Sequence, residues 1–218
     1  MSGSRKSFPL VPAFQAESFT IDNLERIIRI LKSYQVKELK FTSGHRLGLS
    51  GLTREELACV SHELQQFSTA RGNSWYTSLQ ACPGREYCRY GLDDSETLAR
   101  RIKEIELPVL PPGKIKVGIA GCGRCCTEPY VRDIGLIAGN TGWTLIFGGN
   151  AGGRPRIGDV ITEKLTAGQV VELIRRCLTV YQENAGAKMR TARFMEVYGT
   201  KPFLEAIFAQ PLPEMESE

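Results

Sequence analysis

The stretch KIKVGIAGCGRCC, residues 114–126, runs from a short apolar segment directly into three cysteines. Residues 115–121 are mostly apolar and include β-branched side chains, which predicts a strand that is buried on both faces. The cysteines then lie in a loop at the end of that strand, beside Gly121 and Gly123. Thiols packed this densely at a strand end indicate metal chemistry rather than core packing.

Cysteine usage along the whole chain supports this interpretation. The chain has 218 residues, of which seven are cysteines, and four of these form two pairs, Cys82 with Cys88 and Cys122 with Cys126. The first residues, MSGSRKSFPLVPAF, contain neither an apolar signal core nor a cleavage site, so we expect a cytoplasmic protein. In a chain without export signals, an odd number of cysteines that includes two tight pairs favours a metal centre over disulfides.

Zinc and an iron–sulfur cluster are the two metal centres that such thiolates could hold. Zinc sites usually use C-x2-C pairs, and Cys122 with Cys125 has this spacing, whereas Cys82 with Cys88 is C-x5-C. A four-iron cluster spreads its ligands over separate irons and accepts wider, unequal spacings. The spacing therefore favours iron–sulfur, with a zinc-stabilised binding module as the alternative.

Composition and charge narrow the class of protein. The chain is 42% hydrophobic, as in folded globular proteins, and no apolar run reaches the roughly 20 residues of a membrane span. Its 28 basic and 24 acidic residues give a net charge of +4. The basic residues are dispersed, without the interleaved aromatic side chains of a nucleic-acid surface, so we expect no nucleic-acid or membrane partner.

Hydrophobic periodicity divides the chain near Gly72 into a small α+β domain, residues 1–71, and a larger α/β domain, residues 72–218. The expected helices span residues 20–33, 53–67, 94–106 and 165–185, with a pair of short helices within 190–208. The expected strands lie within residues 36–52, from residue 76 into the first cysteines, and within 115–121 and 141–149.

Three further segments carry local expectations. Residues 127–139 are predicted to leave the cysteine loop as a helix or turn, and the prolines of residues 107–113 mark a linker. Cys59 and Cys177 each stand alone in a predicted helix, where we expect them to be buried as small apolar side chains.

Three stretches together resemble the sirohaem and 4Fe-4S region of the sulfite and nitrite reductase family. That family's signature is C-x5-C followed later by C-x3-C, and the resemblance covers residues 70–218. It implies one repeat of that α+β fold, with the residues before it similar to the family's small ferredoxin-like half-domain. The stretches are ACPGREYCRYGLDDSETLARRI (81–102), KIKVGIAGCGRCCTEPYVRDIGLIAG (114–139) and GGNAGG (148–153).

The resemblance implies a ligand set for the cluster, namely Cys82, Cys88, Cys122 and Cys126. The sulfur of Cys126 would also bridge to the sirohaem iron. The loop has Gly123 and Arg124 where the family usually has proline and asparagine, which leaves Cys125 as an alternative bridging thiol.

The resemblance also implies basic side chains around the carboxylates of sirohaem and the anionic substrate. Lys114 and Lys116 share a face of the expected strand and are similar to a lysine pair that contacts substrate in this family. A solvated surface charge is the alternative for each basic residue. The expected sirohaem contacts are Arg85, Arg124, Arg154, Arg156, Gly149 and Asn150.

Gly44 and Thr77 occupy positions where the family usually has arginines, so we expect Arg46 to contact substrate together with the two lysines. The family enzymes usually contain two such repeats, whereas this chain has one, so either two copies assemble or the site is simpler. We expect a monomer or a homo-oligomer.

The function implied by the resemblance is six-electron reduction of sulfite to sulfide by a small, assimilatory-type sulfite reductase. Nitrite reduction to ammonia and non-catalytic electron transfer are the alternatives. The chain has neither a C-x2-C-x2-C-x3-C-P run nor a G-x-G-x-x-G fingerprint after a strand. Electrons are therefore expected from a separate donor protein such as a ferredoxin or cytochrome.

Overall fold

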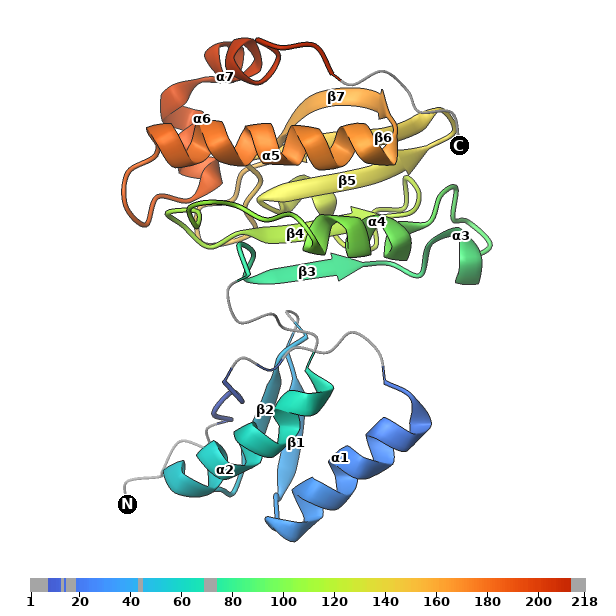
Figure 1. Ribbon diagram of the computed structural model, residues 1–218, viewed down its shortest axis with the longest axis vertical. Coiled ribbons are helices and arrows are strands. Elements are labelled where there is room, and N and C mark those ends of the chain that lie inside the picture. The colour runs from blue at the N-terminus through green and yellow to red at the C-terminus, as the bar shows by residue number, and fades with distance from the viewer. Residues whose placement is uncertain (1–7, 13, 15–18, 43–44, 69–73, 213–218) are drawn as a thin grey trace. The chain divides into compact units, whose positions relative to one another are not determined.

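The computed structural model describes residues 8–12, 14, 19–42, 45–68 and 74–212 (Figure 1). The chain divides into two compact units, Met1–Ser74 and Trp75–Glu218, and each has its own hydrophobic core. The boundary predicted near Gly72 lies outside the described residues, and the division into residues 1–71 and 72–218 stays a prediction.

The first unit packs two helices with an antiparallel hairpin. Its core includes Leu47, Leu49 and Val60, all of which are buried. Thr20 caps the first helix, and Thr53 with Glu56 forms a capping box at the start of the second. The elements are α1 Ile21–Ser33, β1 Glu38–Phe41, β2 Leu47–Ser50, α2 Arg54–Leu64 and the 3-10 turn η1 Gln65–Phe67.

The second unit is built on a mixed five-stranded sheet. Its strand order follows the sequence, with β3, β4 and β5 parallel and β5, β6 and β7 antiparallel. The strands are β3 Ser78–Ala81, β4 Lys116–Ala120, β5 Ile134–Gly139, β6 Gly142–Phe147 and β7 Asp159–Leu165. The mixture of helices with a mixed sheet confirms the predicted α+β class.

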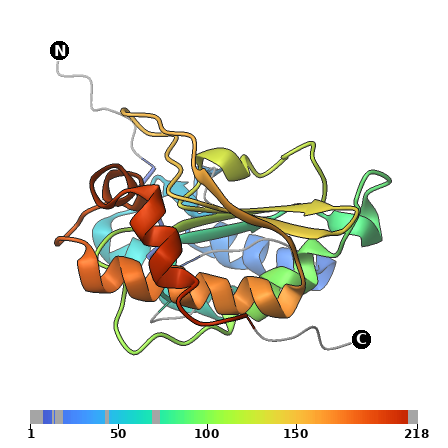
Figure 2. The same cartoon turned by 90° about the horizontal axis from the view of Figure 1, so that it is seen from above.

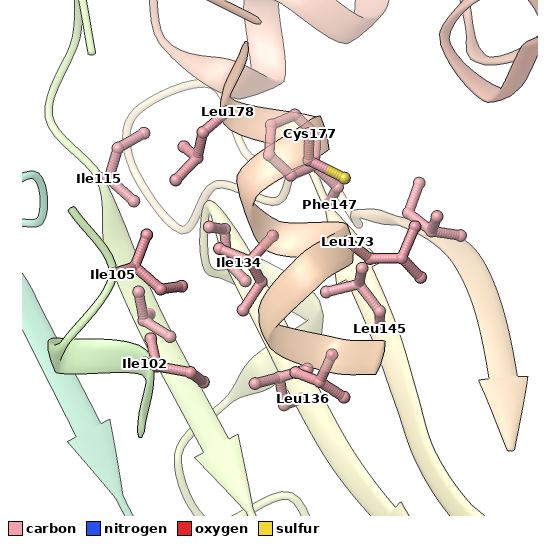
Figure 3. Packing of buried hydrophobic residues seen from close by; sticks show 14 of the residues in the cluster. Ile102, Ile105, Ile115, Ile134, Leu136, Leu145, Phe147, Leu173, Cys177 and Leu178 are labelled. Atoms are coloured by element: carbon pink, nitrogen blue, oxygen red, sulfur yellow. The ribbon is translucent and has the colours of Figure 1, made fainter. Parts of the chain in front are cut away.

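Two helices of the second unit, α4 and α5, pack against this sheet (Figures 1 and 2). In Figure 3, Leu173 and Leu178 of α5 belong to the same buried cluster as Ile134 of β5 and Leu145 of β6. The helices are α3 Gly84–Tyr87, α4 Ser95–Lys103, α5 Ala167–Asn184, α6 Thr191–Tyr198 and α7 Thr200–Ile207.

Three local predictions differ from the structure. Residues 127–139 contain only the 3-10 turn η2, Pro129–Val131, and then enter β5, whose residues are nearly all buried, so its apolar run has no strand-like alternation. Strand β7 was not predicted because it is a charged strand that pairs along one side only. Cys177 is fully buried as expected, but Cys59 lies exposed on α2.

In the part of the chain that the structure describes, no helix is both long enough and apolar enough to cross a membrane. The cytoplasmic location stays a prediction.

Candidate metal centre

The two cysteine pairs follow neighbouring parallel strands. Cys82 comes directly after β3 and Cys122 comes two residues after the end of β4, so both leave the same edge of the sheet. The Cys82 N–H donates to the Ile119 carbonyl oxygen at 3.0 Å, and the Leu92 N–H donates to the Gly121 carbonyl oxygen at 2.7 Å. Backbone hydrogen bonds therefore join the two cysteine loops at their bases.

The first loop turns tightly around Ser95, which is fully buried at the start of α4. The Ser95 hydroxyl donates to the Cys82 carbonyl oxygen at 3.0 Å, and it lies 3.4 Å from the Cys82 sulfur. Gly84 has a φ of +63°, and a Cβ atom there would lie 2.6 Å from Ser95 Oγ. A glycine is thus required where α3 begins, and the Cys88 N–H then donates to the Gly84 carbonyl at 2.9 Å.

The second loop holds its thiols around a left-handed residue, Cys125, which has a φ of +54°. Partial burial, followed by the proximity of Cys122 and Cys126, raises the pKa of the Cys125 thiol. Its sulfur donates weakly to the Gly123 carbonyl oxygen at 3.5 Å. A Cβ atom at Gly123 would meet nothing within 4 Å, so open space lies beside the loop.

The chemistry of the donors in the two loops suits an iron–sulfur cluster. Both loops supply free cysteines, and a four-iron cluster binds each thiolate through a different iron. The Gly121 N–H donates to the Cys82 sulfur at 3.0 Å, a contact that stabilises a thiolate. The donor set and the space beside Gly123 therefore fit a 4Fe-4S cluster.

Arg132 links the roots of both cysteine loops, and sequence analysis missed it. Its side chain is 12% exposed and donates to the Thr127 carbonyl at 3.1 Å, to Gln80 Oε1 at 2.7 Å and to the Glu128 carboxylate at 3.1 Å. Gln80 lies two residues before Cys82, and Thr127 directly follows the second cysteine loop. No spacing rule predicts the contact with Gln80, because it joins residues 52 apart in the sequence.

Glycines let the segment after the cysteines lie directly on the sheet. A Cβ atom at Gly118 would lie 2.7 Å from the Thr127 carbonyl oxygen, and one at Gly135 would lie 2.2 Å from the Pro129 carbonyl oxygen. Residues 127–132 therefore lie against β4 and β5 on a patch without side chains.

A second link joins the outer parts of the loops. The Arg124 guanidinium lies over the Tyr90 ring at 3.7 Å from its centroid, and the Arg89 guanidinium lies 4.6 Å from the same centroid. Arg124 belongs to the second cysteine loop and Tyr90 follows the first. Arg85 and Arg124, two of the expected sirohaem contacts, are both exposed beside the cysteines.

The other expected sirohaem contacts form a loop between β6 and β7. Arg156 donates to the Gly148 carbonyl at 2.9 Å and pairs with Asp159 at 2.7 Å. The Asn150 side-chain amide donates to the Arg154 carbonyl at 2.8 Å, and exposed Arg154 pairs with Glu196 at 3.0 Å. These contacts hold the loop in shape and join it to Glu196 of α6.

Gly149 has an internal role as well. A Cβ atom there would lie 2.5 Å from the carbonyl oxygens of both Tyr130 and Arg132. This glycine therefore allows its loop to pack against residues 130–132, and this close packing is sufficient to explain why a glycine is present there.

The expected substrate lysines lie at the other end of the sheet. Lys116 pairs with Ser78 at the start of β3 and β4, whereas the cysteines follow the ends of these strands. The five-residue strand β4 spans about 16 Å and separates Lys116 from the second cysteine loop, and the role of Lys114 and Lys116 as substrate contacts stays a prediction. Arg46 belongs to the first unit, where its N–H donates to Thr42 Oγ1 at 3.1 Å.

Comparison with known proteins bears on this cysteine site. Residues 74–215 match the family described as "Nitrite and sulphite reductase 4Fe-4S domain". The chain is 38% identical over 201 residues to "Sulfite reductase, assimilatory-type" of Nitratidesulfovibrio vulgaris, which covers 92% of each protein. It is 34% identical over 193 residues to the large subunit of "Nitrite reductase [NAD(P)H]" of Klebsiella oxytoca, covering 87% of this chain but 20% of that protein.

Solved structures share the fold. The NirA protein of Mycobacterium tuberculosis has a TM-score of 0.69 at 20% identity, covering 88% of this chain and 38% of that one. Dissimilatory sulfite reductase I has a TM-score of 0.76 at 14% identity, covering 96% of this chain and 70% of that one. The resemblance inferred from C-x5-C and C-x3-C is thus confirmed, and the chain belongs to the nitrite and sulphite reductase 4Fe-4S domain family.

Proposed function

We propose that the protein is a sulfite reductase of the assimilatory type, which reduces sulfite to sulfide. The observation that carries this proposal is the pair of cysteine loops at one sheet edge, in a chain that matches an assimilatory-type sulfite reductase over nearly the whole length of both. The nitrite reductase of Klebsiella oxytoca is matched over only a fifth of its length. Nitrite is therefore the second candidate substrate.

The cofactors of this family are a 4Fe-4S cluster and sirohaem, and we assign the cluster to Cys82, Cys88, Cys122 and Cys126. Together these cofactors supply electrons to a substrate bound at the sirohaem iron. Cys126 is the exposed thiol of the set, which suits a sulfur shared with a second centre. Cys125, whose sulfur is directed to the Gly123 carbonyl, is the alternative bridging residue.

The protein's own residues hold and tune this centre. The Gly121 N–H donates to the Cys82 sulfur and disperses thiolate charge, which raises the reduction potential of a cluster bound there. Arg132 and the Arg124–Tyr90 contact keep the loops in register. Positioned ligands of this kind need no rearrangement when electrons arrive.

Basic side chains are proposed to bind the anions. Exposed Arg85 and Arg124 lie beside the cysteines and have no ion pair among the described residues, so both can pair with sirohaem carboxylates. Arg154 and Arg156 already pair with carboxylates of this chain, which makes them weaker candidates. Lys114, Lys116 and Arg46 remain proposed substrate contacts.

The proposal is tested by turnover with a small artificial donor. Purified protein with reduced methyl viologen should consume sulfite and release sulfide, and its optical spectrum should show sirohaem and an iron–sulfur cluster. Cys122→Ser should lose cluster iron and activity, whereas Cys59→Ser, at an exposed cysteine of α2, should keep both.

Three results would contradict the proposal in different ways. Nitrite-dependent oxidation of the dye without sulfite turnover would assign the alternative substrate. Bound cofactors without any anion-dependent oxidation would indicate an electron carrier. A colourless protein containing zinc would refute the cluster itself.

A further inference from the structure

We propose that a cavity between α4 and α5 binds a free α-amino acid with an aliphatic side chain. The two helices contact each other where both pack on the sheet (Figure 1). The cavity has a volume of about 390 Å³ and is lined by Arg101, Glu104, Gly168, Val171 and Arg175. None of these residues belongs to the cysteine loops or to the proposed contacts with sirohaem and substrate, so the cavity is a site of its own.

The lining residues come from one face of each helix. On α5, Gly168, Val171 and Arg175 follow the spacing i, i+3 and i+7, which places them on one side of the helix. Arg101 lies in the last turn of α4, and Glu104 is the C-terminal cap residue of that helix, three positions later. The two faces therefore oppose each other across the cavity.

Gly168 keeps the cavity open. A Cβ atom at this position would meet no atom closer than 3.9 Å outside the adjacent residues and the helix backbone, and one of the atoms at that distance is Nη2 of Arg101. Packing therefore does not require a glycine here, and glycine is a poor helix former. A larger side chain at residue 168 would project toward the Arg101 guanidinium and fill the space between the helices.

The charged side chains of the cavity are not used by other contacts of the protein. Among the described residues, Arg101, Glu104 and Arg175 form no ion pair. Arg175 donates to the Glu106 carbonyl oxygen at 3.3 Å. Glu104 lies at the C-terminal end of α4, where the helix dipole disfavours a carboxylate. This carboxylate therefore remains available to bind a cationic group.

The arrangement of charges selects the ligand. Two guanidinium groups bind a carboxylate, whereas the Glu104 carboxylate binds an ammonium group and repels a simple anion. An α-amino acid at neutral pH carries both charged groups on the same carbon atom. Val171 and the aliphatic parts of the arginine side chains provide an apolar wall for its side chain. A cavity of this volume accommodates an amino acid of the size of leucine.

Isothermal titration calorimetry of the holoenzyme tests the site with L-leucine and two analogues that each lack one charge. Isocaproate lacks the ammonium group, and L-leucinamide lacks the carboxylate. L-Leucine should bind at least about tenfold more tightly than either analogue, because each analogue loses one ion pair in the cavity. L-Leucine should also raise the melting temperature of the protein. Neither measurement requires turnover of sulfite, so the result is independent of the proposed reductase function.

Variants locate the site and separate its charges. Gly168→Leu should abolish binding while the protein remains folded, because the added side chain fills the cavity and suits a helix. Arg101→Gln should weaken L-leucine binding about tenfold. Glu104→Gln should weaken L-leucine binding as well, but it should tighten isocaproate binding because it removes a repulsive charge. Glu163→Gln, the same substitution at an exposed glutamate of β7, is the matched control and should bind L-leucine as the wild type does.

Other outcomes would refute the amino-acid site. L-Leucine that neither releases heat nor raises the melting temperature at millimolar concentration would show that the cavity binds no such ligand. Isocaproate or inorganic phosphate binding as tightly as L-leucine would indicate a general anion site. Binding that survives Gly168→Leu would place the amino acid elsewhere on the protein.

Discussion

Arg132→Met tests whether the link between the roots of the cysteine loops governs retention of the cluster. The substitution removes hydrogen bonds to Thr127 and Gln80 and keeps an aliphatic chain over Gly118. A hydrogen bond from a charged donor contributes about 1.5–3 kcal/mol. The Glu128 carboxylate is 64% exposed, so its ion pair adds less than about 1 kcal/mol.

We therefore expect Arg132→Met to lower the free energy of unfolding by about 3 kcal/mol. If that energy also opposes local opening of the cysteine loops, opening becomes about 100-fold more frequent. Urea unfolding of the apoprotein measures the first effect. The rate at which an iron chelator bleaches the cluster absorbance in the holoenzyme measures the second.

The chain provides a matched control in Arg176, whose side chain is 17% exposed and also binds several oxygens. It pairs with Glu172 at 2.8 Å and donates to the carbonyls of Ile207, Gln210 and Pro211. Arg176→Met should cost similar stability, because it breaks similar contacts, without accelerating bleaching. Equal bleaching rates in the two variants would refute a specific role for Arg132.

Three further changes test other parts of the structure. Asp133 is 1% exposed and accepts from Arg190, Thr191 and the Lys116 N–H, so Asp133→Ala should destabilise the protein by about 3–5 kcal/mol in thermal unfolding; a loss below about 1 kcal/mol would contradict this. Cys126→Ser should abolish the magnetic coupling between cluster and sirohaem in Mössbauer spectra while Cys125→Ser preserves it, and the reverse result would assign the bridge to Cys125. Burial, followed by the charge of Asp133, raises the pKa of Tyr181 to about 12, so wild-type stability should fall as the pH rises from 10 to 12. Tyr181→Phe should flatten that decline in pH-dependent unfolding experiments, and an unchanged slope would show that other groups cause it.

The sequence predicted the structure best in segments where the order of apolar residues or the spacing of cysteines follows directly from their structural role. The apolar run before GCGRCC predicted β4, and the amphipathic repeat predicted α5, because burial on fixed faces imposes those patterns. The spacings C-x5-C and C-x3-C suggested a cluster because each places two thiol ligands on one short loop. Strand β5 was missed because periodicity alone does not distinguish a short apolar run in a strand from one in a buried helix.

Contacts between distant residues were beyond prediction from a single sequence. Arg132 meets Gln80 only because β3 and β4 are neighbours and residues 127–132 lie on the sheet. Lys116 and Cys122 are six residues apart in the sequence but lie toward opposite ends of β4, because an extended strand carries its two ends far apart. Sequence distance and spatial distance diverge most strongly along an extended strand.

The backbone hydrogen bonds between the cysteine loops also bear on how the holoenzyme is assembled. The bonds from Cys82 to Ile119 and from Leu92 to Gly121 join main-chain atoms and use no thiol. The loops can therefore hold their shape before iron and sulfide arrive, unlike small metal domains that fold only around their ion. A protein that delivers the cluster would then insert it between loops that already have their final shape. Because Cys126 is exposed, its sulfur would be the first ligand that an incoming cluster could reach.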